Sequence, residues 1–144
     1  TDEGWLWKLE AMTRSGHGDQ FFAASGGVEY TFYQLLDSNA DVGVLVEYHR
    51  DDRDTTAPAT FFDDDVFVGT RITLNDEYDT EFLGGFIVDR RTGERFYSIE
   101  SSRRLTDHWK VEFDARFYAH IQATGPASGL QSDDHVQLRL VRYF

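Results

Sequence analysis

Hydrophobic side chains recur at every second residue through most of this chain. Near its start, Trp5, Trp7 and Leu9 share one parity, whereas Lys8 and Glu10 share the other. A two-residue period places the two sets on opposite faces of a β-strand, and no segment shows the 3.6-residue period of an amphipathic helix. The sequence therefore predicts an all-β protein.

The alternation predicts eight strands in a single domain over residues 1–144. Most of these segments have about ten residues or more, which is the length a tilted strand needs to cross a bilayer. Strands in other proteins more often have about 5–6 residues. The predicted strands are residues 4–14, 21–36, 41–50, 65–75, 79–89, 95–105, 109–118 and 135–144.

The connections are predicted to alternate in length. One set is short and rich in turn-forming residues: 37–40, 76–78 and 106–108. The other set includes two long members: 15–20, 51–64, 90–94 and 119–134. Short periplasmic turns and longer extracellular loops are typical of outer-membrane β-barrels. We therefore expect an antiparallel up-and-down transmembrane barrel, with both termini on the short-turn side.

Charge and hydropathy narrow the function classes. A net charge of −12 speaks against nucleic-acid binding, because phosphate recognition needs a basic surface. The chain has no run of about 18 apolar residues, which argues against a transmembrane helix. A barrel is compatible with that hydropathy, because alternating strands average out. The absence of cysteine excludes disulfides and thiolate metal sites.

The two predicted faces differ in charge. On the apolar face we identify only Arg103 and Arg142, both near the short-turn side, where a long side chain can reach the headgroups. The polar face mixes both signs, and an interior tolerates such a set only as a paired network. The residues predicted to form an interior ionic network or pore lining are Lys8, Glu10, Arg14, Glu47, Arg71, Glu100, Glu112, Arg116 and Arg139.

Aromatic residues gather near the predicted strand ends. Amphipathic rings are most stable at a water–lipid boundary, so two aromatic girdles are expected of a barrel in a bilayer. The predicted girdle on the short-turn side contains Trp5, Trp7, Tyr78, Trp109, Tyr143 and Phe144. The predicted girdle on the loop side contains Phe21, Phe22, Tyr48, Phe61, Phe62, Phe96, Tyr97 and Phe117.

The last strand, residues 135–144, resembles the C-terminal signature of bacterial outer-membrane barrels, in which alternating apolar residues precede a final Phe. The matching residues are Val136, Leu138, Leu140 and Phe144. Arg142 departs from the signature, and Tyr143 is one position out of phase. The chain thus resembles the small eight-stranded OmpA, OmpX and OmpW class, or the C-terminal part of a longer outer-membrane barrel.

This resemblance implies a protein integral to the bacterial outer membrane, with both termini in the periplasm. It implies contact with membrane lipid and lipopolysaccharide. It also implies that the barrel assembly machinery recognises the C-terminal strand through Phe144 as an assembly signal. The oligomeric state stays open. Because the chain begins at Thr1 without a signal peptide, we expect either a processed form or a piece of a longer protein.

Three functions are compatible with this pattern. The first is an integral barrel with a structural, anchoring or passive small-solute transport role, whose ion-paired interior fills an eight-stranded lumen. The second is the C-terminal section of a larger porin-like channel, in which the same charges line the pore. The third is a soluble lipocalin-like barrel, which would turn its apolar face inward around a ligand.

Catalysis, metal binding and cofactor binding are not expected. The candidate groups show no spacing that places a nucleophile beside a base. They are His17 with Asp19, His49 with Asp51, and His120 with Ser128 and Asp133. A second set of acidic residues could bind a divalent cation but is more simply a solvated loop. It contains Asp51, Asp52, Asp54, Asp63, Asp64 and Asp65.

Overall fold

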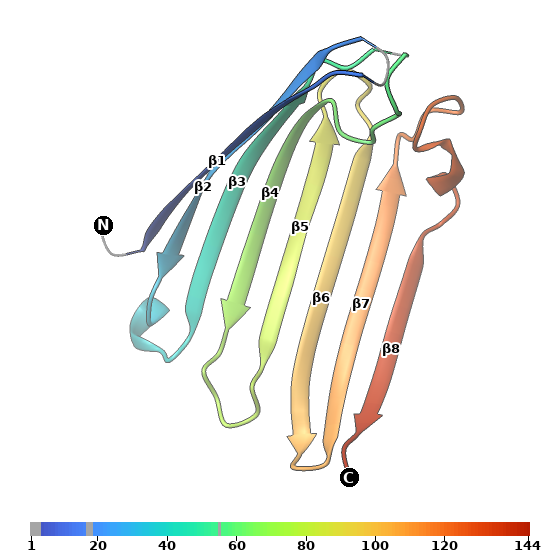
Figure 1. The fold of residues 1–144 in the computed structure, drawn as a ribbon. Coiled ribbons are helices and arrows are strands. Elements are labelled where there is room, and N and C mark those ends of the chain that lie inside the picture. The colour runs from blue at the N-terminus through green and yellow to red at the C-terminus, as the bar shows by residue number, and fades with distance from the viewer. Residues whose placement is uncertain (1–3, 17–18, 55) are drawn as a thin grey trace.

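The protein folds into a single sheet of eight antiparallel strands in chain order (Figure 1). The computed structural model describes residues 4–16, 19–54 and 56–144. The strands are β1 (Trp5–Arg14), β2 (Phe21–Phe32), β3 (Asp41–Asp51), β4 (Asp64–Thr73), β5 (Glu81–Asp89), β6 (Arg95–Thr106), β7 (Trp109–Ala119) and β8 (His135–Arg142). The predicted all-β, up-and-down, antiparallel architecture is confirmed.

The strand register keeps the two predicted faces continuous across the sheet. One row of directly paired residues crosses seven strands without a polar break: Trp7, Val28, Val46, Val68, Phe86, Tyr97 and Phe117. A slip of one residue would move a whole strand's apolar set to the polar face. The alternation in the sequence therefore determines the register as well as the strands.

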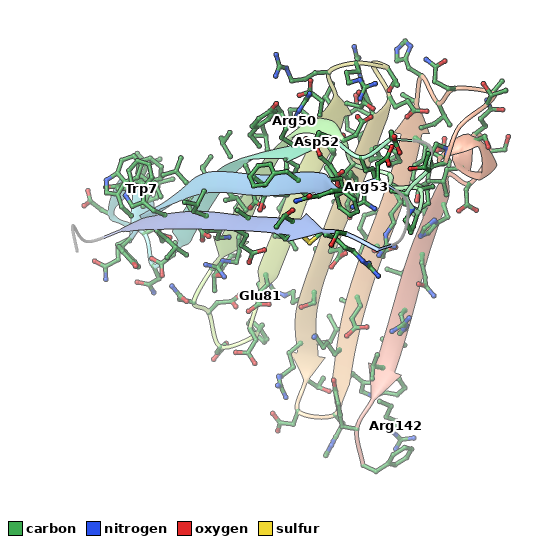
Figure 2. All side chains as sticks on the ribbon, turned by 45° about the horizontal axis from the view of Figure 1, so that its top comes forward. Trp7, Arg50, Asp52, Arg53, Glu81 and Arg142 are labelled. Carbon is green, nitrogen blue, oxygen red and sulfur yellow. The ribbon has the colours of Figure 1, made fainter. Side chains whose placement is uncertain are left out.

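The sheet is strongly curved but open. Among the described residues, β1 pairs only with β2 and β8 pairs only with β7. Figure 2 shows Trp7 on β1 and Arg142 on β8 far apart, so the turn ends of the two edge strands are splayed. The prediction that these eight strands close into a barrel is therefore corrected to an open trough. Each edge strand leaves backbone N–H and C=O groups without a ladder partner.

The strands form one layer, and the described part of the chain has no central hydrophobic core. Of the described residues, the buried apolar ones are Phe21, Ala57, Ala115 and Ala127. Trp7 is 76% exposed, Leu9 84% and Leu138 72%. A soluble lipocalin-like barrel would shield such side chains in its middle, so their exposure argues against that alternative.

The second predicted strand is longer in the sequence than in the structure. Residues 21–36 were expected to be extended, but β2 ends at Phe32 and a 3₁₀ turn, η1 (Leu35–Asp37), follows. Gln34 and Leu36 adopt positive φ angles, and the Gln34 N–H donates to Asp41 Oδ1 at 2.9 Å. A second 3₁₀ turn, η2 (Ser128–Leu130), precedes β8. Neither of these two described helices is long and apolar enough to cross a membrane.

The predicted alternation of connection lengths is confirmed only in part. The two longest connections, residues 52–63 and 120–134, lie on the same side of the sheet. On that side, however, residues 90–94 form a shorter link than 33–40 or 74–80 on the opposite side. At the connections 33–40 and 74–80, the strands end earlier than expected because their terminal residues bend into turns. Asn75 and Asp79, for example, have φ angles of 52° and 48°.

Asp76 organises the turn between β4 and β5 and gives it a pH dependence. Its carboxylate accepts hydrogen bonds from the Thr80 N–H at 2.8 Å and from Thr80 Oγ1 at 2.8 Å. The hydrogen bond from the Thr80 N–H is the main cause that lowers the pKa of Asp76 below 3.8. The Thr80 hydroxyl and Arg103 lower it further. The ionised carboxylate therefore stabilises the fold at pH values above its ordinary pKa. This contribution is lost as the pH falls through the lower pKa of the folded state.

We expect Asp76→Asn to unfold at a lower temperature than the wild type at neutral pH. The difference should shrink as the pH falls below 3.8, because the wild-type carboxylate then becomes protonated. Thermal unfolding in detergent, followed by circular dichroism across this pH range, measures the effect. Glu77→Gln is the control, since Glu77 has no such bonds among the contacts of the described turn. A constant difference at all pH values would contradict the prediction.

Candidate functional site

The polar face forms the hollowed inner side of the trough, and most of the predicted ionic residues meet there. A hollow of about 510 Å³ opens between β4 and β8, near Glu81 in Figure 2. Among its lining residues are Arg71, Glu81, Glu100, Glu112, Arg116 and Arg139. All but Glu81 belong to the predicted set, which the sheet gathers from separate strands because they share one parity.

Glu29 on β2 forms ion pairs with one residue on β1 and one on β4. Its carboxylate lies 3.5 Å from Lys8 Nζ on β1 and 3.4 Å from Arg71 Nη2 on β4. The side chain of Glu29 is only 18% exposed. Lys8 and Arg71 were both predicted as network members, but Glu29 as their common partner could not be identified without the strand order.

A second network links β6, β7 and β8. Arg116 Nη2 lies 3.7 Å from Glu100 and 3.5 Å from Asp114. Asp114 Oδ1 in turn lies 3.0 Å from His135 Nε2. A third network lies on β7 and β8. In it, Glu112 lies 3.3 Å from Lys110 and 3.5 Å from Arg139.

These ion pairs are solvated. The side chains of Arg71 and Arg139 are 61% and 59% exposed. Exposed pairs of this kind contribute about 0–1 kcal/mol each, so they hold the sheet together only weakly. The expected network sealed inside a closed cylinder is therefore corrected: the groups line an open hollow and can meet water and solutes.

The remaining predicted members lie outside these networks. Glu47 lies 3.3 Å from His49 on the same strand. Glu10 lines a smaller hollow near the loop end, together with Phe62. Arg14, in the part of the chain that the structure describes, has no ion-pair partner within 4.0 Å.

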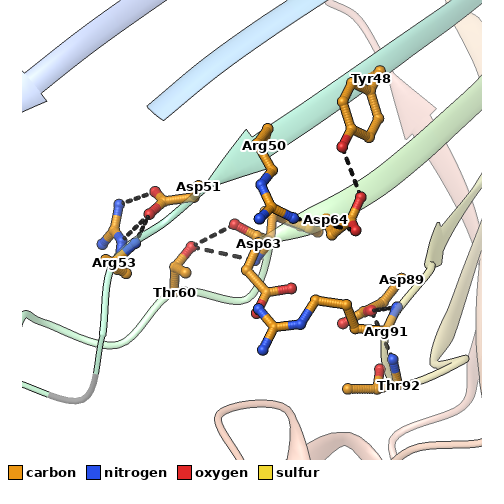
Figure 3. Close-up of polar contacts among 11 residues, drawn as sticks. Tyr48, Arg50, Asp51, Arg53, Thr60, Asp63, Asp64, Asp89, Arg91 and Thr92 are labelled. Atoms are coloured by element: carbon orange, nitrogen blue, oxygen red, sulfur yellow. Dashed lines mark hydrogen bonds and ion pairs between the residues drawn. The ribbon is translucent and has the colours of Figure 1, made fainter. Parts of the chain in front are cut away.

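The connection of residues 52–63 folds over the inner face at the loop end. The Phe62 ring lies 6.3 Å from that of Phe96, which lies 5.7 Å from that of Tyr118. Arg53 donates from Nε to Asp51 at 2.9 Å, as Figure 3 shows, and its guanidinium lies 4.5 Å from the centre of the Phe21 ring. Phe21, Phe62 and Phe96 were predicted in the lipid girdle, but they face the inner side.

Asp65 is the one fully buried side chain beneath this connection among the described residues. Its exposed fraction is 0%, and neither carboxylate oxygen has a hydrogen-bond partner. Its direct neighbours in the sheet are His49 on β3 and Asp89 on β5. No group of three or more potential metal ligands assembles in the described part of the chain, so the acidic residues of this connection do not converge on a cation site.

We expect Asp65→Asn to raise the free energy of unfolding by about 1 kcal/mol at alkaline pH, because a neutral amide avoids the burial of an unpaired charge. Urea unfolding in detergent measures the change. Asp114→Asn is the matched control, because the carboxylate of Asp114 already has partners and its loss should not stabilise the protein. A loss of stability in Asp65→Asn would show that the carboxylate has a stabilising partner.

Most of the candidate groups weighed for catalysis can be located in the structure. His17 lies outside the described residues. His49 contacts Glu47, whereas Asp51 is engaged by Arg53. The Ser128 hydroxyl donates to the Gly125 carbonyl at 2.8 Å. None of the described candidate groups therefore places a nucleophile beside a base.

Phe144, the predicted assembly signal, lies beyond the end of β8 and is fully exposed. The guanidinium of Arg142 lies 4.9 Å from its ring centre and 5.6 Å from that of Trp109. The position that departs from the C-terminal signature is thus covered by aromatic contacts at the turn end of the sheet. Recognition of Phe144 by assembly machinery stays a prediction.

Comparison with known proteins identifies no family for this chain: no family model, curated protein or solved structure matches it.

Proposed function

We propose that this chain forms part of the wall of an outer-membrane channel. Its apolar face contacts lipid, and its charged face lines a water-filled lumen through which small solutes pass passively. The observation that carries this proposal is a sheet with both faces exposed, one of them free of charge across a membrane-sized band. A structure of this kind has its hydrophobic surface outside and its polar surface inside, as barrels in lipid do.

The height of the uncharged band fits a bilayer. On the apolar face of the described strands, charged side chains occur only near the two ends. At the loop end they are Arg50, Asp64, Arg90 and Arg95, and at the turn end they are Arg103 and Arg142. On β6 the segment from Arg95 to Arg103 has nine residues. A strand tilted by about 45° needs about 9–11 residues to cross the hydrocarbon core of a bilayer.

The open edges favour a barrel wider than eight strands. In hydrocarbon every backbone N–H and C=O needs a partner within protein, so the free edges of β1 and β8 each need a partner strand. We propose that further strands, from the same polypeptide or from other copies, pair with both edges. Two features support a wide lumen over a filled eight-stranded interior: the splayed edges, and the solvation of Arg71 and Arg139 in the inner hollow.

Labelling of single cysteines tests the assignment of the faces. The chain has no cysteine, so Ser98→Cys on the inner face and its neighbour Ile99→Cys on the outer face each give one reactive site. In lipid vesicles, a water-soluble thiol reagent should modify Ser98→Cys quickly and leave Ile99→Cys protected. The reverse pattern would mean that the faces are inverted. Protection at both positions would indicate a sealed interior.

Planar-bilayer recording tests the lumen. The inserted protein should give large, steady conductance steps, since a wide barrel leaves an aqueous channel. Replacement of Arg71, Arg116 and Arg139 by Gln should lower the ratio of anion to cation conductance, because it removes solvated positive charges from the lumen. Silent insertion, together with protection of Ser98→Cys, would contradict a channel and favour a structural or anchoring role.

A further inference from the structure

An arginine cluster lies at the loop end of the outer face. Asp64 accepts from the Tyr48 hydroxyl at 2.8 Å and lies 3.3 Å from Arg50 and 3.2 Å from Arg90 (Figure 3 shows its contacts with Tyr48 and Arg50). The guanidinium of Arg90 also lies 5.7 Å from the Tyr48 ring centre. The contacts of Asp64 and Tyr48 thus hold two guanidinium groups side by side, each about half exposed.

Arg95 adds a third guanidinium on the same face. It pairs directly with Val88, two residues before Arg90. Arg90 directly follows the end of β5 (Glu81–Asp89), so Arg95 lies close to it across the β5–β6 turn, and both side chains are long. Within the described structure Arg95 has no hydrogen-bond or ion-pair partner, so its donors are available to a ligand.

We propose that Arg50, Arg90 and Arg95 bind the phosphate monoester headgroup of a membrane lipid in the leaflet at the loop end. This inference rests on the proposed function, because it requires the outer face to contact lipid. Arg50 and Arg90 share the single carboxylate of Asp64, and Arg95 has no ion-pair partner in the described structure, so guanidinium donors are in excess here. A phosphate monoester offers a charge of about −1.5 to −2 and three acceptor oxygens, whereas a phosphodiester carries about one negative charge.

The surroundings favour a lipid as the source of that phosphate. Directly next to the cluster toward the membrane lie Val66 and Val88, the first residues of the uncharged band. Acyl chains can lie on this band while the phosphate meets the arginines. Guanidinium groups bind phosphate oxygens with paired, charge-assisted hydrogen bonds, and next to an apolar surface these bonds are poorly screened by water.

Native mass spectrometry of the folded chain in detergent tests the site, with phosphatidic acid as the monoester probe and phosphatidylglycerol as the diester probe. We expect tighter binding of phosphatidic acid. The triple variant Arg50→Gln, Arg90→Gln, Arg95→Gln should weaken it on the order of tenfold or more. The matched control is Arg71→Gln, Arg116→Gln, Arg139→Gln, which removes the same charge from the inner face and should leave the affinity unchanged.

Several results would overturn the inference. Equal losses in both triple variants would show a general charge effect, and equal affinity for the two lipids would remove the role of the monoester. Displacement of the lipid by inorganic phosphate at a similar concentration would assign the site to a soluble anion. Should the triple variant not fold, Arg95→Gln removes only a partner-free side chain and should still weaken binding severalfold.

The face assignment separates the two proposals. If Ile99→Cys is protected in vesicles but phosphatidic acid binds the triple variant of Arg50, Arg90 and Arg95 as tightly as the wild type, only the headgroup site is wrong. If Ile99→Cys reacts quickly with the water-soluble reagent, the outer face does not contact lipid, and the proposed function itself is wrong.

Discussion

Arginine in place of Val46 is expected to lower the free energy of unfolding in lipid vesicles by about 2–4 kcal/mol, the cost of a lipid-facing arginine near the middle of a bilayer. Val46 lies at the centre of the uncharged band, paired with Val28 and Val68, and its exposed fraction is 43%. In water, replacement of such an exposed residue would change stability by about 0.5 kcal/mol or less. The large effect therefore requires lipid against this face.

The neighbouring residue provides the control for Val46→Arg. Leu45 points to the inner face and pairs with Glu29 on β2. A guanidinium at this position meets water and an acidic partner, so Leu45→Arg should cost about 1 kcal/mol or less. Denaturant unfolding in phosphatidylcholine vesicles, followed by tryptophan emission and by gel mobility with and without heating, measures both variants. Equal costs for the two would contradict a lipid-facing Val46.

The sequence was sufficient to predict the strands, their faces and their order, because these depend on local features. The two-residue period assigns each side chain to a face, and antiparallel neighbours in an up-and-down sheet follow chain order. The contrast in polarity between the two faces then leaves one register, as the row from Trp7 to Phe117 shows. No long-range information is needed for any of these steps.

Closure of the sheet could not be predicted in the same way. Whether β1 meets β8 depends on the curvature and stagger summed over all strands, which no local pattern reports. The expectation of a closed barrel came from the membrane-type pattern of strands and connections, and the strand number suggested that eight strands suffice for closure. The open edges are the reason why we propose a section of a wider wall rather than a filled barrel.

The composition of the site was predictable, but its pairing was not. Parity placed Arg71, Glu112 and Arg139 on the inner face correctly. Their partners depend on strand order and side-chain reach, so Glu29 was missed as the bridge between β1 and β4. The arginine cluster was missed for another reason. Arg90 falls in a predicted loop, and Arg50 and Arg95 are terminal residues of predicted strands, so none of the three was assigned to a face.

Two glycines on the inner face explain a further part of the fold. Gly69 on β4 and Gly85 on β5 are direct partners, and the Phe67 ring lies over both. A Cβ atom added to Gly69 would lie 2.7 Å from the Phe67 ring, which is closer than real side chains approach. The glycines therefore provide room for an inward aromatic ring, an arrangement that protects a glycine in a strand.

Gly69→Ala should therefore cost about 1–3 kcal/mol of unfolding free energy in the wild type, because the new methyl group displaces the ring. In a Phe67→Ala background the same change should cost about 0.5 kcal/mol or less, since the obstacle is gone. The difference is the coupling energy of the pair, obtained from denaturant unfolding of all four proteins in detergent. Gly26→Ala on the outer face is the control: its Cβ would lie 3.6 Å from Leu9, an ordinary contact, so it should be nearly neutral. Equal costs of Gly69→Ala in both backgrounds would mean that backbone freedom, and not the space under Phe67, is what this glycine provides.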